Sequence, residues 1–140
     1  DNYVLGEVLS GDNAWFNEKT GVKQNVIKRI RYWSFPKVLC IDLKRIDATN
    51  KKRHTLVDFP LTNLSLEKYV VGYNSRKFVY DLYGVCNHHG SAAGGHYTAY
   101  IKGVNGWYEF NDTRITILQD TEQIVSPKAY CLFYRKKSIV

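Results

Sequence analysis

Apolar and polar residues alternate along much of this chain, or gather in short apolar runs, and both patterns are typical of strands. Residues 26–33 alternate, which predicts a half-exposed strand, whereas residues 37–45 are strongly apolar, which predicts a strand at the centre of a sheet. Further strand-like runs cover residues 79–86, 96–101, 107–110 and 129–134, with a brief strand or bend at 115–118. Residues 63–69 and 120–125 are instead predicted to form short helices, each with a capping residue at its start.

The runs at residues 79–86, 96–101 and 107–110 organise the rest of the chain, because only short turn signals separate them. Residues 90–95 are Gly, Ser and Ala, so this predicted loop has little side-chain bulk and another group can approach its backbone. An Asn-Gly pair marks a hairpin turn between the runs at 96–101 and 107–110. A hairpin of this length returns Asn111 or Asp112 to the side of His96, which begins the run at 96–101.

This juxtaposition has chemical meaning. An imidazole that an amide or a carboxylate orients, at the edge of a loop of small residues, makes up most of a nucleophilic triad. The alternative is that His96 is only a turn residue beside glycines. Spacing alone does not choose between Asn111 and Asp112 as the orienting residue.

The same residues carry a family resemblance. The segments GGHYTAY (94–100) and WYEFND (107–112) resemble the histidine box of the ubiquitin-specific proteases, which are papain-like cysteine deubiquitinases. The resemblance implies that His96 is the general base and that Asn111 is the third triad member, holding the ring through its side-chain oxygen. It also implies that Asp112 is the adjacent acid that family members often carry. Because Asp112 follows Asn111 on an extended strand end, we expect its side chain to point to the other side.

The resemblance extends over nearly the whole chain and predicts its fold. It implies the C-terminal half of a papain-like catalytic domain, with residues 1–33 at the end of the fingers region and residues 34–140 forming the palm sheet. We therefore expect an α+β fold that is mainly an antiparallel β-sheet with one or two short helices. The chain begins directly in folded-looking sequence, as a fragment of a longer protein would.

Four further residues are implied to contact the substrate. The backbone of Gly94 and Gly95, which carries no side chains, is implied to let the narrow C-terminal tail of ubiquitin lie flat beside the loop. Tyr97 is implied to form a wall of that channel, and His89 to flank it. A metal site made of His89 and His96 would lack carboxylate or Cys partners, so no metal is expected there.

The chain contains no residue that resembles the family's nucleophile. Cys40, Cys86 and Cys131 each lie within an apolar, strand-like run, so we expect buried, reduced thiols that are poorly nucleophilic. Cys86, which is nearest to the loop, is the least improbable exception. The nucleophilic Cys is therefore expected upstream, in an N-terminal half of the catalytic domain that would be the partner of this chain.

The fingers region departs from the family pattern. Asn17-Glu18-Lys19-Thr20 stands where members often carry the Cys-x-x-Cys half of a zinc ribbon, and neither Asn nor Thr replaces a thiolate on structural zinc. We therefore expect no metal and no cofactor, and fingers that packing alone holds together.

Composition limits the partners and the compartment. The 140 residues suffice for one domain, and 20 basic against 13 acidic residues give a net charge of +7. A basic chain suits nucleic acid, but the basic segment 47–55 lacks interleaved aromatic residues, so we read it as a solvated loop that includes His54. No apolar run is long enough for a membrane span. Three unpaired Cys indicate a reducing compartment, the cytoplasm or nucleus.

Taken together, the sequence predicts a deubiquitinase segment that supplies the His and Asn half of a catalytic triad, with ubiquitin and ubiquitinated proteins as partners. The alternative is a catalytically inactive module of the same fold that binds ubiquitin or acts as a scaffold. A basic domain that binds nucleic acid is a weaker rival, supported by charge alone.

Overall fold

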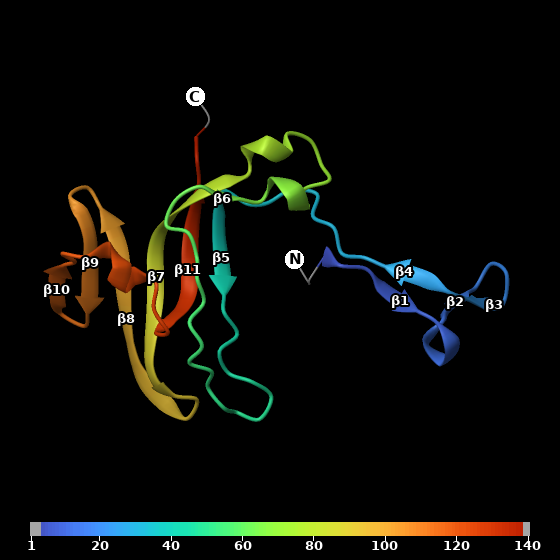
Figure 1. Cartoon of the computed structure of the whole chain (residues 1–140), viewed down its shortest axis with the longest axis horizontal. Coiled ribbons are helices and arrows are strands. Elements are labelled where there is room, and N and C mark those ends of the chain that lie inside the picture. The colour runs from blue at the N-terminus through green and yellow to red at the C-terminus, as the bar shows by residue number, and fades with distance from the viewer. Residues whose placement is uncertain (1–3, 139–140) are drawn as a thin grey trace.

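A seven-stranded antiparallel sheet forms the main body of the computed structural model, which describes residues 4–138 (Figure 1). Its strand order is β10-β9-β8-β7-β11-β5, and the short β6 pairs with the start of β7. The strands are β5 (Val38–Asp42), β6 (Leu64–Ser65), β7 (Val79–Ser91), β8 (Gly94–Gly103), β9 (Gly106–Asn111), β10 (Arg114–Ile117) and β11 (Ala129–Lys136). The mainly antiparallel architecture expected from the sequence is confirmed.

Strands β7 to β10 follow one another as hairpins, as the turn signals predict. The Asn-Gly pair closes the β8–β9 hairpin, where Gly103 pairs with Gly106. The β7–β8 hairpin differs from the expectation, since the predicted loop 90–95 is reduced to a tight turn at residues 92–93. Small residues allow this because the backbones of the two strands approach closely over residues 89–96.

Strand β5 lies at the edge of the sheet and not at its centre, so that part of the prediction is wrong. It pairs only with β11 in the described residues, and its exposed and half-buried positions alternate. Cys40 is exposed there, contrary to the expectation of a buried thiol. The apolar run that suggested a central strand therefore faces a surface that this chain itself leaves open.

Aromatic side chains fill the core beneath the sheet. Tyr80 and Tyr134 are fully buried, and each hydroxyl donates to a backbone carbonyl beside it, Tyr80 to Pro36 at 2.7 Å and Tyr134 to Pro60 at 2.8 Å. These bonds satisfy the polar end of each ring, so the buried rings leave no hydroxyl unpaired. The other buried apolar residues are Phe59, Phe78, Leu82, Val85, Tyr100, Trp107, Ile124, Ala129 and Leu132.

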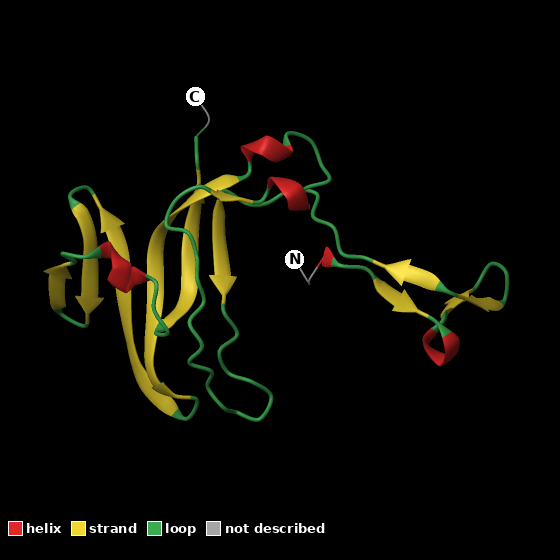
Figure 2. Ribbon diagram, in the orientation of Figure 1, coloured by secondary structure: helices red, strands yellow, loops and turns green. Residues whose placement is uncertain are grey.

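The helices of the described chain are single 3₁₀ turns (Figure 2). They are η2 (Gly11–Asn13), η3 (Glu67–Tyr69), η4 (Ser75–Lys77) and η5 (Thr121–Ile124). The predicted helical segments correspond to η3 and η5, and the Asp120 side chain caps η5 by accepting from the Glu122 N–H at 2.8 Å. Over the described residues, no helix has the length and apolarity needed to cross a membrane.

Two small antiparallel ribbons precede the sheet and project to its side (Figure 1). They pair β1 (Glu7–Leu9) with β4 (Val26–Lys28) and β2 (Trp15–Asn17) with β3 (Val22–Gln24). The predicted strand 26–33 is therefore only three residues long. No residue between 4 and 33 is buried, so the ribbons are held by hydrogen bonds and not by the packing that we expected.

The basic segment 47–55 is more ordered than the predicted solvated loop. The Asp47 carboxylate accepts hydrogen bonds from Thr49 and from the backbone of Lys51, which closes a turn at Asn50. Lys52 points inward and is only 8% exposed, and Arg45 at the base of the segment is only 2% exposed. His54 is exposed, as predicted.

Candidate active site

The structure brings His96 and Asn111 into direct contact. His96 lies near the start of β8, and Asn111 is the last residue of β9, where the β8–β9 pairing ends at Ala99 and Phe110. This diagonal arrangement across two strands places His96 Nε2 2.7 Å from Asn111 Oδ1, which is hydrogen-bond distance. The predicted partner of the imidazole is therefore present in the folded chain.

Asp112 also lies near the imidazole, but its role is weaker. Its Oδ2 is 3.9 Å from His96 Nε2, too far for a hydrogen bond, and its side chain is 78% exposed. We expected Asp112 to lie on an extended strand end and point away from His96. That expectation is wrong, because Asp112 has a left-handed backbone (φ 50°) in the turn to β10, which returns the carboxylate to the same side.

The hydrogen bond assigns different tasks to the two ring nitrogens of His96. Asn111 Oδ1 is only an acceptor, so Nε2 must carry the proton and donate it. In the neutral ring, Nδ1 then holds the lone pair and can accept a proton from a nucleophile. The imidazole is 48% exposed, which leaves it accessible to a group that this chain does not supply.

His89 lies on the same face as His96. The two residues are cross-strand partners, and their ring centroids are 6.5 Å apart. His89 Nε2 is 3.3 Å from Thr98 Oγ1, which fixes the ring beside the candidate base. Burial, and then the positive charge of Lys128, lower the pKa of His89 below its usual value, which favours a neutral ring there.

The predicted substrate residues do not all gather on that face. Tyr97 points to the opposite side of β8, where it stacks on His88 with ring centroids 4.6 Å apart. The packing of this chain itself requires glycine at position 95, since a Cβ there would collide with the carbonyl oxygen of His89 and with the His88 ring. A Cβ on Gly94 would meet open space, so only Gly94 leaves room for an approaching backbone.

The thiols of the chain do not form a nucleophilic pair with His96. Cys86 pairs with Ala99, three residues along β8 from His96, and burial raises the pKa of its thiol. Burial, followed by the charge of Asp42, raises the pKa of Cys131 to about 11. Cys40 is on β5, which β11 and β7 separate from β8.

At the tip of the β2–β3 ribbon, the side chain of Asn17 makes two hydrogen bonds. Its Oδ1 accepts from the Lys19 N–H at 3.0 Å, and its Nδ2 donates to Gln24 Oε1 at 3.1 Å. These bonds close the β2–β3 turn. Within residues 4–138, no cluster of three or more His, Cys, Asp or Glu is arranged to hold a metal ion.

Sequence reasoning missed two residues next to the site. Thr98 is 5% exposed and holds His89, and nothing in the HYTAY run distinguishes it from a Thr that only packs in a strand. Lys52 is buried against the β7 backbone at His88 and Gly90. Its position within the run Lys51-Lys52-Arg53 looks like any solvated basic loop, so the sequence held no signal for it.

Comparisons with known proteins point to one family. Residues 8–134 match the family model described as ubiquitin carboxyl-terminal hydrolase. Ubiquitin carboxyl-terminal hydrolase 9 of Arabidopsis thaliana is 37% identical over 139 residues, and ubiquitin carboxyl-terminal hydrolase 4 of Mus musculus is 37% identical over 140 residues. Each alignment covers 96% of this chain, which spans only 15% and 14% of the lengths of these two relatives.

Solved structures give the same result. Two structures of the SAGA DUB module that contains Ubp8 match with TM-scores of 0.81 and 0.80 at 28% and 27% sequence identity. They cover 100% and 99% of this chain, which spans 32% of each matched chain, and the second is bound to monoubiquitin. A family match over residues 8–134 and a shared fold show that this chain belongs to the ubiquitin carboxyl-terminal hydrolase family.

Proposed function

We propose that this chain is part of a cysteine-type deubiquitinase that hydrolyses the isopeptide bond after the C-terminal Gly-Gly of ubiquitin. The observation that carries the proposal is the 2.7 Å contact between His96 Nε2 and Asn111 Oδ1 in a chain of this family. An imidazole held in one tautomer by a neutral amide is the base half of a Cys-His-Asn triad. The matched Ubp8 module bound to monoubiquitin supports ubiquitin as the substrate.

The mechanism assigns proton transfer to this chain. A Cys thiol from elsewhere in the protein gives its proton to His96 and attacks the isopeptide carbonyl carbon as a thiolate. His96 then protonates the leaving lysine amine, and later takes a proton from the water that hydrolyses the acyl-enzyme. Asn111 keeps the ring oriented through both steps. Gly94 offers open backbone beside His96 for the tail of ubiquitin, and His89 flanks that position.

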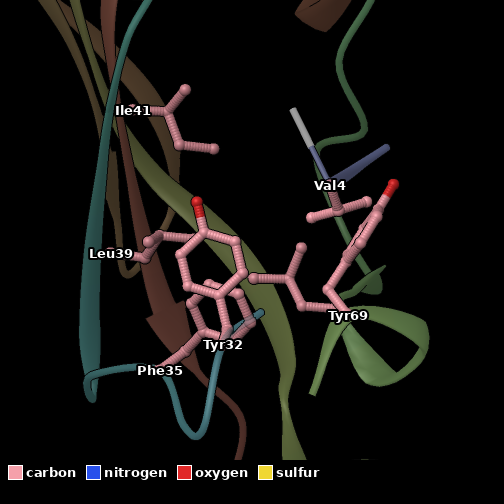
Figure 3. A pocket seen from close by; sticks show the side chains of 7 residues that line it. Val4, Tyr32, Phe35, Leu39, Ile41 and Tyr69 are labelled. Atoms are coloured by element: carbon pink, nitrogen blue, oxygen red, sulfur yellow. The ribbon is translucent and has the colours of Figure 1, made fainter. Parts of the chain in front are cut away.

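The partner of this chain in the proposal is the N-terminal half of the catalytic domain, which would carry the nucleophile. An apolar pocket of about 440 Å³ supports it, with Leu39 and Ile41 of β5 on one side and Val4 and Tyr69 on the other (Figure 3). Strand β5 is an edge that this chain leaves uncovered. An open apolar pocket beside an uncovered edge strand is what a missing part of a domain core leaves behind.

The same proposal assigns regions and compartment. Residues 1–33 would be the end of the fingers, and residues 34–140 the palm with the histidine box. Cys40, Cys86 and Cys131 are all free thiols, which supports a reducing compartment, the cytoplasm or the nucleus.

The test is hydrolysis of a ubiquitin–fluorophore conjugate by the full-length protein and by its His96→Ala variant. We expect turnover by the wild-type protein and its loss in His96→Ala. The control is Lys102→Ala, because Lys102 is exposed and lies at the opposite end of β8 from His96. An inactive wild-type protein that still binds ubiquitin would favour the alternative of a binding module, and an active His96→Ala variant would refute the assigned base.

A further inference from the structure

Strand β7 extends past the end of its neighbour β11, which leaves part of its edge unpaired. The β11–β7 pairing ends at Ala129 and Asn87, whereas β7 continues to Ser91 and pairs on its other side with β8 (Figure 1). Successive backbone groups in a strand point to opposite edges, so the carbonyl groups of His88 and Gly90 face the side that β11 no longer covers. Backbone carbonyls at such a place need another donor.

Lys52 provides that donor. Its Nζ is 2.7 Å from the His88 carbonyl oxygen and 3.2 Å from the Gly90 carbonyl oxygen. The side chain reaches there from the basic segment 47–55, which is far from β7 in the sequence and lies next to the end of the β7–β8 hairpin (Figure 1). One ammonium group therefore replaces the missing strand along two carbonyls of β7.

The Lys52 ammonium is unusual because it is buried without a counterion. Among the described residues, no carboxylate lies within ion-pair distance of its Nζ, and burial lowers its pKa from the usual value. A buried charge is retained only where hydrogen bonds compensate for the lost hydration. The turn that Asp47 closes, and the bond from the Arg53 N–H to the Arg45 carbonyl, hold the segment so that Lys52 points inward.

The held carbonyls belong to the part of β7 that positions the candidate base. His89, between the two carbonyls, is the cross-strand partner of His96, and Gly90 pairs with Gly95. Gly90 has a positive φ of 118°, so its backbone is in a conformation that depends on its surroundings. Because the backbones of residues 89 and 95 touch, a displacement of β7 at this point would displace His96 as well.

We propose that Lys52 is a positioning residue for His96, which clamps the end of the β7–β8 hairpin through the carbonyls of His88 and Gly90. The proposal rests on the proposed function for its catalytic consequence, and on the hydrogen bonds alone for the clamp. Lys52 touches neither substrate nor nucleophile in this role. Its loss would misplace the imidazole relative to a nucleophile that another part of the protein supplies.

The first experiment compares kinetics in the full-length protein. Lys52→Met keeps the length of the side chain and removes its donors, Lys52→Arg keeps a cation with donors, and Lys51→Met removes a charge from the exposed neighbouring residue. We expect Lys52→Met to lower kcat for a ubiquitin–fluorophore conjugate about 10–100-fold, as small misplacements of a catalytic group do, with KM changed less than about threefold. Lys52→Arg should restore most of kcat, and Lys51→Met should leave it unchanged.

The second experiment measures the clamp without relying on activity. Hydrogen–deuterium exchange over residues 88–96 should be faster in Lys52→Met than in the wild type, and unchanged in Lys51→Met. Unchanged exchange in Lys52→Met would refute the clamp. Faster exchange with an unchanged kcat would show a structural role only and overturn the positioning role. A wild-type protein without activity would refute the proposed function, and the exchange result would then decide the clamp alone.

Discussion

At the scale of single residues, the His96–Asn111 pair determines what the site can do. A neutral amide holds the ring in one tautomer, but it stabilises the protonated ring less than a carboxylate would. Asp112 supplies a carboxylate 3.9 Å from Nε2, yet it is mostly in water, where its attraction for the ring is screened. Orientation thus comes from Asn111, and Asp112 contributes at most a weak electrostatic effect.

This division predicts an order of effects on kcat/KM in the full-length protein. His96→Ala should cost the most, about 10²–10⁴-fold, because it removes the group that transfers the proton. Asn111→Ala should cost less, and Asn111→Asp should be tolerated because an acceptor oxygen keeps its place. Asp112→Ala should stay within about threefold of the wild type, as expected for an exposed charge.

Steady-state kinetics of the four variants, with folding checked by circular dichroism, measures this order. If Asp112→Ala lost as much activity as His96→Ala while Asn111→Ala stayed near the wild type, Asp112 would be the orienting residue.

Two neighbouring glycines give a second prediction at this scale. Alanine at Gly95 would place a Cβ against the His89 carbonyl oxygen and the His88 ring, whereas alanine at Gly94 would meet nothing. Gly95→Ala should therefore destabilise the full-length protein by about 1–3 kcal/mol through overpacking. Gly94→Ala should change stability by less than about 0.5 kcal/mol. Thermal unfolding of both variants checks the difference, and equal melting temperatures would contradict the close approach of the two strands.

At the scale of elements, the sequence predicted those features that depend on neighbouring residues alone. The Asn-Gly hairpin, the closing strand β11 and the Asp120 cap each depend on residues within a few positions of one another. The length of β7 and the edge position of β5 depend instead on which strands meet, and no short window encodes that.

The candidate site likewise contains features that a short stretch of sequence predicts and features that depend on distant strands. The meeting of His96 and Asn111 follows from one hairpin, and that contact could be predicted. The inward turn of Lys52 could not, since it depends on a β7 edge that is 36 residues away in the sequence. The left-handed turn at Asp112 was also missed, because an Asp after a strand continues or turns according to the next strand, β10.

The β2–β3 ribbon gives a prediction at the scale of elements. Asn17 closes the β2–β3 turn with its own hydrogen bonds, at the position where a Cys-x-x-Cys pair would bind zinc. Amide and hydroxyl groups bind structural zinc far more weakly than thiolates do. We therefore expect the purified full-length protein to hold no zinc in this ribbon, and its melting temperature to be unchanged by a chelator. Elemental analysis after dialysis provides the measurement, and stoichiometric zinc that is lost in Asn17→Ala would contradict the expectation.

At the scale of the whole molecule, the proposed chemistry is divided between two parts of a longer protein. This chain carries the proposed base, its proposed orienting amide and the proposed clamp, all on the β7–β8–β9 hairpins and the segment packed against them. It spans 15% of one curated relative and 32% of the matched Ubp8 chains, and its β5 edge and apolar pocket are open. In the proposed function, completion of the site depends on how another part of the protein packs against this sheet.

This division predicts that the 140-residue chain alone does not hydrolyse a ubiquitin–fluorophore conjugate. Cys86 is the candidate nucleophile nearest to His96, but it faces Ala99, and burial raises the pKa of its thiol, so little thiolate forms near neutral pH. Burial raises the pKa of Cys131 to about 11, and Cys40 lies on β5, which two strands separate from β8. We expect a fluorescence signal equal to that of buffer from the chain, and turnover from the full-length protein under the same conditions. Turnover by the purified chain that disappears in Cys86→Ser would show that it carries its own nucleophile, and would overturn both the divided site and the inert role of its thiols.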